Sequence, residues 1–155
     1  MGIEIERKFL VKNDSWRGAV DCEWRIQQGY LATTGTLTVR VRLKGDTAYL
    51  TLKGPPRGLV RTEFEYEIPV EDGKAMMREL TILPVIEKDR YRVPYGNHHW
   101  VVDVFTGDNA GLVLAEIELS REHEHFAIPG WVGAEVTDDL SYTNANLARR
   151  PFKDW

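Results

Sequence analysis

The sequence predicts a mainly β (α+β) fold in one domain, an antiparallel barrel or a strongly curved sheet with a few flanking helices. Eight stretches combine β-branched, aromatic and alternating apolar residues, which is typical of strands. Short turns separate several of them, and such connections favour antiparallel pairing. Only two stretches show helical spacing. So many strands with so few helices indicate a barrel or a curved sheet.

The expected strands follow one another along most of the chain. Gly45-Asp46 forms a turn between the third and fourth, and "KGPPRGLV" forms a longer Gly/Pro loop after the fourth. Gly96-Asn97 forms the turn between the sixth and seventh. The strands are expected at residues 3–11, 24–31, 36–44, 47–53, 60–69, 87–93, 99–105 and 112–120.

Two helices are expected. In residues 70–83, "VEDGKAMMRELTIL", Met76, Met77 and Leu80 recur at near-helical spacing after an acidic start. Residues 138–150, "DDLSYTNANLARR", begin with a candidate Asp cap and end in two arginines, which suits the helix dipole.

Size and composition limit the classes of protein. The 155 residues, 43% apolar and 28% charged, are typical of one soluble globular domain over residues 1–155. A net charge of −4 does not favour nucleic-acid binding, so no nucleic-acid partner is expected. Cys22 is the single cysteine, which excludes an intrachain disulfide and a cysteine-based zinc site. With no apolar leader and no membrane-spanning run, we expect a cytoplasmic protein without a membrane partner.

The polar faces of the expected strands carry charges sorted by sign. In "LTVRVRLK", Arg40, Arg42 and Lys44 share one face, and in "LVLAEIEL" so do Glu116 and Glu118. One such strand is typical of a sheet with a solvated face. A solvated face, however, usually mixes both signs with neutral polar residues. Taken together, the strands therefore favour a charged interior over a solvated sheet.

A charged interior must be wet, paired or occupied by a ligand, because an isolated ion in a dry core costs many kcal/mol. Near the N-terminus, "EIERK" places Glu4, Glu6 and Lys8 on one strand face. Glutamates supply the oxygen ligands that a hard divalent cation prefers, and Lys and Arg bind polyphosphate. A cation on the carboxylates and a polyanion on the bases would neutralise both sets. The pattern therefore predicts a site for a metal-bound polyphosphate.

The ordered motifs resemble those of a known family. "EIERK" has the Glu-x-Glu-x-Lys form that opens members of the CYTH superfamily, the triphosphate tunnel metalloenzymes. The similarity continues through "VRVRLK", "TLKG", "RTEFEYEIP", "EKDRYR", "VDVF", "AEIEL" and "EVTDDLSYTNANLA". It covers nearly the whole chain, and the length resembles that of the compact bacterial members.

The resemblance implies an eight-stranded antiparallel β-barrel with a charged tunnel, a small-molecule triphosphate substrate, and Mg²⁺ or Mn²⁺ as cofactor. It assigns metal binding to Glu4, Glu6, Glu63, Glu116 and Glu118, and substrate binding to Lys8, Arg40, Arg42, Lys53, Lys88 and Arg90. The catalytic roles fall to Lys8, Glu116 and Glu118.

The expected function is metal-dependent hydrolysis of inorganic tripolyphosphate to pyrophosphate and phosphate. One alternative is a class IV adenylate cyclase, in which the ribose 3′-hydroxyl of ATP is the nucleophile. Another is a polyphosphate or nucleotide sensor without enzymatic activity. The sequence leaves open the preferred triphosphate, the preferred metal and the oligomeric state.

Overall fold

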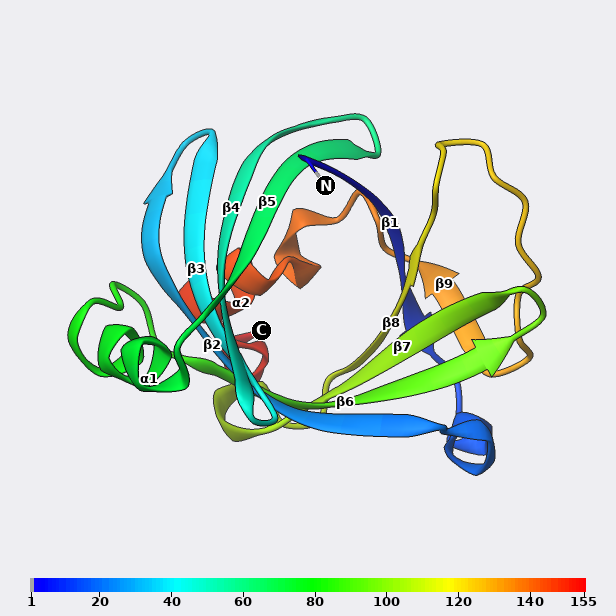
Figure 1. The fold of residues 1–155 in the computed structure, drawn as a ribbon. Helices are drawn as coiled ribbons and strands as arrows, with labels where there is room; N and C mark the ends of the chain where they lie inside the picture. The colour runs from blue at the N-terminus through cyan, green and yellow to red at the C-terminus, as the bar shows by residue number, and fades with distance from the viewer. Residues whose placement is uncertain (1) are drawn as a thin grey trace.

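A computed structural model describes residues 2–155 (Figure 1). Its strands include all eight that the sequence predicts, and also β9, which it does not. The strands are β1 (Gly2–Val11), β2 (Cys22–Thr34), β3 (Leu37–Lys44), β4 (Thr47–Arg57), β5 (Val60–Ile68), β6 (Ile86–Tyr95), β7 (His98–Phe105), β8 (Val113–Glu118) and β9 (Val132–Glu135). The α-helices are α1 (Val70–Glu79) and α2 (Asn144–Arg149), and short 3-10 helices lie at Ser15–Ala19, Gly107–Asn109, Leu140–Tyr142 and Phe152–Asp154.

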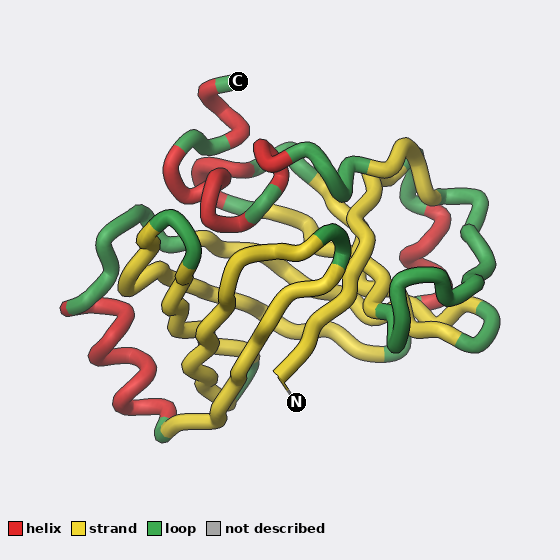
Figure 2. Tube along the Cα trace, turned by 90° about the horizontal axis from the view of Figure 1, so that it is seen from above, coloured by secondary structure: helices red, strands yellow, loops and turns green. Residues whose placement is uncertain are grey.

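The strands form one closed antiparallel barrel, and Figure 2 shows them turned by 90° from the view of Figure 1. Neighbouring strands follow the order β5-β4-β3-β2-β6-β7-β8-β1, and a β1–β5 pairing closes the ring. This seam is short, because only residues 2–5 of β1 pair with residues 60–63 of β5. Further along, β1 pairs with β8 on one side and with β9 on the other.

The turns follow the glycine pattern of the sequence. Gly45 has a φ of 57° and Gly96 a φ of 59°, in the left-handed region that glycine adopts without steric cost. These two residues make the tight hairpins β3–β4 and β6–β7. The two tight-turn predictions are therefore confirmed. The predicted longer Gly/Pro loop is wrong, because β4 continues to Arg57 and β5 begins at Val60, so only Gly58 and Leu59 lie between them.

Both predicted helices are shorter than expected. α1 ends at Glu79, since the following chain extends along the sheet and Ile82 N–H donates to the Tyr30 carbonyl at 2.9 Å. α2 begins only after Thr143, whose hydroxyl accepts from Asn146 N–H at 3.3 Å. Of the two aspartates that begin the predicted helix, Asp139 accepts from Ser141 N–H and caps a 3-10 helix instead of α2. No helix within residues 2–155 is long and apolar enough to cross a lipid bilayer.

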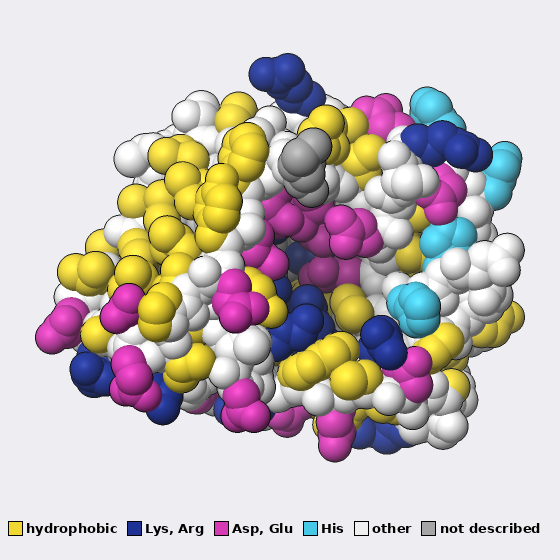
Figure 3. Space-filling model, viewed as in Figure 1, with side chains coloured by type: hydrophobic (Ala, Val, Ile, Leu, Met, Phe, Trp, Pro, Cys, Tyr) yellow, Lys and Arg dark blue, Asp and Glu magenta, His cyan; other side chains and the backbone are white. Residues whose placement is uncertain are grey.

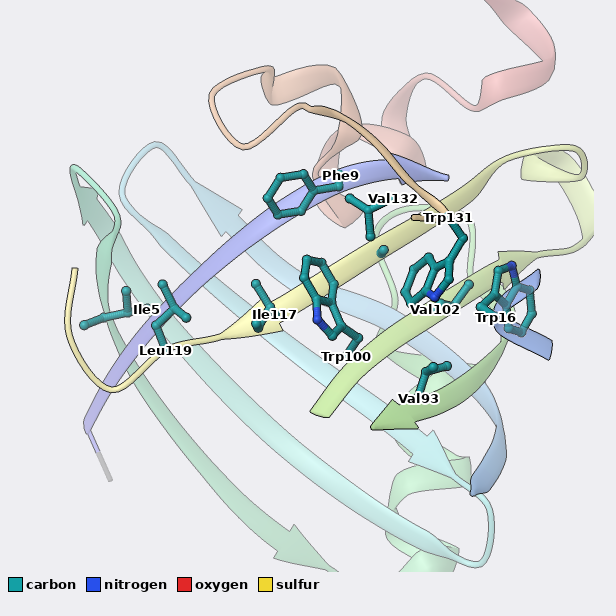
Figure 4. Packing of buried hydrophobic residues seen from close by; sticks show 11 residues of the cluster. Ile5, Phe9, Trp16, Val93, Trp100, Val102, Ile117, Leu119, Trp131 and Val132 are labelled. Carbon is teal, nitrogen blue, oxygen red and sulfur yellow. The ribbon is translucent and has the colours of Figure 1, made fainter. Parts of the chain in front are cut away.

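The largest apolar cluster lies on the outer side of the barrel wall (Figure 4). Trp100, on β7, is fully buried, and its ring centroid lies 5.4 Å from that of Phe9 and 5.8 Å from that of Trp131. Trp131 belongs to the segment between β8 and β9, which folds over β1, β7 and β8. Charged residues alternate with these positions along the same strands, so they point into the barrel.

One end of the barrel interior is apolar. Leu147 and Ala148 of α2 pack against Tyr30, Ile86 and Leu114, whose side chains point inward from β2, β6 and β8. Because α2 closes this end, the charged part of the interior is confined to the rest of the barrel.

Candidate active site: a charged cavity in the barrel

A charged cavity of about 330 Å³ occupies the barrel interior, and Figure 3 shows acidic and basic side chains lining the hollow. Its lining joins carboxylates and bases from six strands. The carboxylates are Glu4, Glu6, Glu63, Glu65, Glu116 and Glu118, and the bases are Arg40, Arg42, Lys44, Lys53 and Arg90.

A second cavity of about 290 Å³ adjoins the first toward α2. The two cavities share Glu6, Arg40, Lys53 and Asn144 as lining residues. The second is also lined by Lys8, Thr38, Arg61, Asn146 and Arg149. The shared lining makes the two cavities parts of one charged channel.

Strand register explains why the charges meet. In β1–β8 pairing, Glu6 lies opposite Glu118 and Lys8 lies opposite Glu116. Directly opposed residues of antiparallel strands have close side chains on the same face. The pairing therefore fixes a patch of carboxylates beside a lysine.

Lys53 bridges the barrel seam. Its ammonium lies 3.0 and 3.2 Å from the two oxygens of Glu4 on β1, and 3.2 Å from Glu63 on β5. These three side chains are largely buried, so the contacts are stronger than exposed ion pairs. One predicted phosphate contact is thus neutralised by two predicted metal ligands.

The carboxylates of β1 and β8 differ in their partners. Glu116 lies 3.7 Å from Lys8 and 3.8 Å from Arg90, and these charges outweigh burial and lower the pKa of Glu116 to about 2. Burial, together with the nearby carboxylates Glu116 and Glu4, raises the pKa of Glu6 to about 8. Burial and the Glu4 charge also raise the pKa of Glu118. The Glu6 side of the patch is therefore short of positive charge.

This donor set fits a hard divalent cation, because five predicted ligands are carboxylates on one stretch of cavity wall. Within residues 2–155, however, no three His, Cys, Asp or Glu side chains are close enough to hold a metal ion. Glu4 and Glu63 contact Lys53, and Glu116 contacts Lys8 and Arg90. Metal binding by this set requires these carboxylates to turn from the bases.

Arg40 and Arg42 form the basic side of the cavity. Arg40 is 5% exposed, and its Nε has no hydrogen-bond partner among residues 2–155. Its other contacts are long, with Nη2 3.5 Å from Thr51 Oγ1 and 3.8 Å from Glu65. Burial, with the charges of Arg40 and Arg90, lowers the pKa of Arg42 to about 9. An anion placed here would satisfy an orphaned donor and relieve this repulsion.

Asp103 is a site residue that sequence reasoning did not assign. It is 1% exposed and accepts from Arg90 Nε at 2.7 Å and Nη2 at 2.8 Å. Although burial alone would raise its pKa, Arg90 and Lys88 hold the pKa of Asp103 well below the ordinary value. The one available signal was an aspartate among the valines of "VVDVF".

Lys88 lies apart from the other predicted phosphate contacts. It is fully buried, its ammonium lies 2.8 Å from Asp103 and donates to Asn144 Oδ1 at 3.2 Å, and it lines neither cavity described above. Burial lowers the pKa of Lys88 to about 7, against the opposing charge of Asp103. The structure thus brings Lys8, Arg40, Arg42, Lys53 and Arg90 to the channel wall and places Lys88 behind it.

Comparisons with known proteins agree with this geometry. The CYTH domain family model matches residues 2–152. A protein of Acetivibrio thermocellus named inorganic triphosphatase is 45% identical over 156 residues, which cover 100% of this chain and 99% of that protein. A Nitrosomonas europaea protein of the same name is 39% identical, covering 94% of this chain and 96% of that protein.

Solved structures show the same likeness. The crystal structure of an inorganic triphosphatase superposes with a TM-score of 0.66 at 34% identity, covering 94% of this chain and 93% of that one. The family match spans nearly the full described chain, and it accounts for the closed barrel and its charged lining. The chain therefore belongs to the CYTH family.

Proposed function

We propose that the protein hydrolyses inorganic tripolyphosphate to pyrophosphate and phosphate. The observation that carries this proposal is the basic cluster of Arg40 and Arg42, with an orphaned guanidinium N–H inside a cavity that also holds carboxylates. The two relatives named inorganic triphosphatase support the same activity.

The channel lining favours an inorganic chain of phosphates. Charged side chains dominate the larger cavity, where the imidazole of His99 is the one aromatic ring among the described lining residues. The adjoining cavity adds Tyr30, but this ring is only 4% exposed and packs against α2, so the channel offers little aromatic surface on which a nucleobase could stack. Bases along the wall can bind successive phosphate groups and offset charge on the group that is transferred. Lys8, Arg40, Arg42, Lys53 and Arg90 are the residues we assign to this role.

Triphosphate tunnel enzymes of the CYTH family are generally metal-dependent. We assign Mg²⁺ or Mn²⁺ to Glu4, Glu6, Glu63, Glu116 and Glu118, and such a cation would polarise the scissile phosphoryl group. Glu118 is solvent-exposed on the cavity wall and lies opposite Glu6, a position that suits a group that orients water and accepts its proton. Water attacks the terminal phosphorus, the bridging P–O bond breaks, and the electron pair leaves with pyrophosphate.

The ion pairs between Lys53 and the carboxylates couple phosphate binding to metal binding. Lys53 holds Glu4 and Glu63, so a phosphate group that draws Lys53 away leaves both carboxylates free for a cation. A cation on those carboxylates likewise frees Lys53 for phosphate. Each ligand should therefore raise the affinity for the other, as thermodynamic linkage requires.

Product assays with tripolyphosphate, ATP and thiamine triphosphate, run side by side with Mg²⁺ or Mn²⁺, test the proposal. We expect equal amounts of phosphate and pyrophosphate from tripolyphosphate, and far slower turnover of the other two. Cyclic AMP from ATP would instead establish the cyclase alternative, and tight binding without any product would establish a sensor. Glu116→Ala should abolish turnover without unfolding the protein, and normal activity in this variant would overturn the carboxylate assignment.

A further inference from the structure

The barrel carries its charges inside, so its outer face is apolar and needs cover. Helix α1 covers part of β3 and β4, and the segment between β8 and β9 covers β1, β7 and β8. Across β3, β4, β5 and the start of β1, large apolar side chains stay uncovered within residues 2–155. Ile3 is 63% exposed, Tyr66 58% and Phe64 45%. Figure 3 shows hydrophobic side chains gathered over these strands, beside the hollow.

These side chains form one continuous patch because register aligns them. Phe64 lies opposite Leu52, which lies opposite Val39, and Tyr66 lies opposite Leu50 in the next row. We call this patch the β3–β5 face, and it comprises Ile3, Leu37, Val39, Leu50, Leu52, Phe64 and Tyr66.

The β3–β5 face is free of charge. The outward positions of residues 37–43, 48–52 and 62–68 hold no charged side chain, although the inward positions are rich in them. Charge depletion and aromatic residues are what distinguish the core of a protein interface from ordinary surface. An outer barrel face in contact with water alone has no need of either feature.

The size of the face matches one half of a protein–protein interface. About half of each aromatic ring is exposed, or about 100 Å² for each of Phe64 and Tyr66, and the whole face exposes roughly 400–500 Å² of apolar surface. A standard interface buries about 800 Å² per partner, of which about 57–65% is apolar. The β3–β5 face supplies that apolar share.

We propose that a second copy of this chain covers the β3–β5 face in a two-fold symmetric dimer. A two-fold interface brings the same surface of both copies together, so a charged patch would repel itself. The chain has a net charge of −4, yet this face holds none of it. Two identical copies can thus meet here without like-charge repulsion.

The interface would also brace the barrel seam. Only residues 2–5 and 60–63 pair across this seam, and Lys53 ties it on the inside through Glu4 and Glu63. Ile3 flanks the same seam on the outside. A second copy on this face therefore holds β1 and β5 together from the outside, as Lys53 does from the inside. This inference rests on the outer face and does not depend on the proposed function.

Light scattering coupled to size exclusion, over about 1–100 µM protein, tests the proposal. We expect the wild type to have the mass of a dimer. The double variant Phe64→Glu/Tyr66→Glu should raise the dimer dissociation constant at least about 100-fold, because aromatic anchors dominate interface energetics. The matched control is Ile128→Glu, since Ile128 is 58% exposed but lies in the segment between β8 and β9. It should remain dimeric.

Circular dichroism and tripolyphosphate hydrolysis show whether each variant is folded. If the charged double variant unfolds, Phe64→Ser/Tyr66→Ser removes the aromatic rings without adding charge and should also be monomeric. A monomeric wild type at about 100 µM would overturn the proposal. So would a dimer that persists in the folded double variant, or one that dissociates equally in Ile128→Glu.

Discussion

The buried ion network at Asp103 provides a sharp test of how this barrel holds its charges. Asp103 accepts three short contacts, two from Arg90 at 2.7 and 2.8 Å and one from Lys88 at 2.8 Å. Asp103→Asn keeps nearly the same shape but removes the negative charge. Lys88, which is fully buried, then loses its nearest counter-charge, and Arg90 keeps the more distant Glu116 at 3.8 Å.

The expected cost follows from burial. Removing one partner of a buried ion pair typically costs about 3–5 kcal/mol, because the remaining charge is left uncompensated. Native domains have about 5–15 kcal/mol of stability in total. For a chain of this length, each kcal/mol shifts the melting temperature by about 2–4 °C, so Asp103→Asn should lower it by about 6–20 °C.

Thermal and urea unfolding followed by circular dichroism measure this loss, and the chain offers a matched control. Asp21 contacts Arg92 with the same two-pronged geometry, at 2.8 and 3.2 Å, but is 40% exposed, against 1% for Asp103. Asp21→Asn should therefore cost less than about 1 kcal/mol. Equal losses in the two variants would refute the reasoning, because burial would then make no difference.

Three further predictions concern the cavity and the packing of α1. Without added metal, tripolyphosphate at a hundredfold excess over Kd should stabilise the wild type by about 2.7 kcal/mol, a melting-temperature rise of about 5–10 °C. Arg40→Ala/Arg42→Ala should lose most of this rise, and a retained rise would place the anion elsewhere. Burial lowers the pKa of Lys88 to about 7 from the ordinary 10.5. Between these values the unfolded chain binds the additional proton, so stability rises with pH. Relative to Lys88→Met, the free energy of unfolding of the wild type should rise by about 1–3 kcal/mol between about pH 7 and about pH 10. Urea unfolding of both proteins at several pH values measures this difference, and the same pH dependence in both would contradict the lowered pKa of Lys88. Gly73→Val should cost about 1–3 kcal/mol, because a Cβ at this position would lie 2.7 Å from Ala48 Cβ, and an unchanged urea midpoint would mean that α1 moves without cost.

Strand alternation made most of the barrel predictable. Side chains two residues apart share a face, so a local pattern such as "LTVRVRLK" shows which residues point together. The eight predicted strands and the common face of Arg40 and Arg42 follow from that pattern and are present in the structure.

β9 was not predictable in the same way. Its four residues, "VGAE", are too short to show alternation. The related signal was Arg7, a charge among the apolar positions of β1, which donates to Glu135 of β9 at 2.8 and 2.5 Å. The partner lies 128 residues away, so no local pattern connects the two.

The sequence also did not indicate how far along the barrel axis each inward side chain lies. Lys88 and Arg90 occupy equivalent inward positions, and both were expected to contact phosphate. The structure separates them, since Arg90 lines the cavity while Lys88 lies fully buried behind Asn144, toward the apolar end closed by α2. The position of that apolar end depends on packing between residues far apart in sequence, and so does the role that Asp103 takes.

The cavity and the β3–β5 face are two consequences of one alternating pattern. Each inward charge on β3, β4 and β5 has at least one outward apolar neighbour in the chain, so a wall that presents bases to an anion presents a largely apolar surface on its other side. Where α1 or the segment before β9 covers that surface, the chain stabilises its own wall. On the outer side of the wall that carries Lys53 and Glu63, no segment within residues 2–155 covers the apolar surface. There β5 is also joined to β1 by a short pairing of residues 2–5 with residues 60–63. A chain with charges on the inner face of its strands and apolar residues on the outer face needs another surface to cover the apolar side. On the β3–β5 face, an identical copy provides that cover without bringing like charges together.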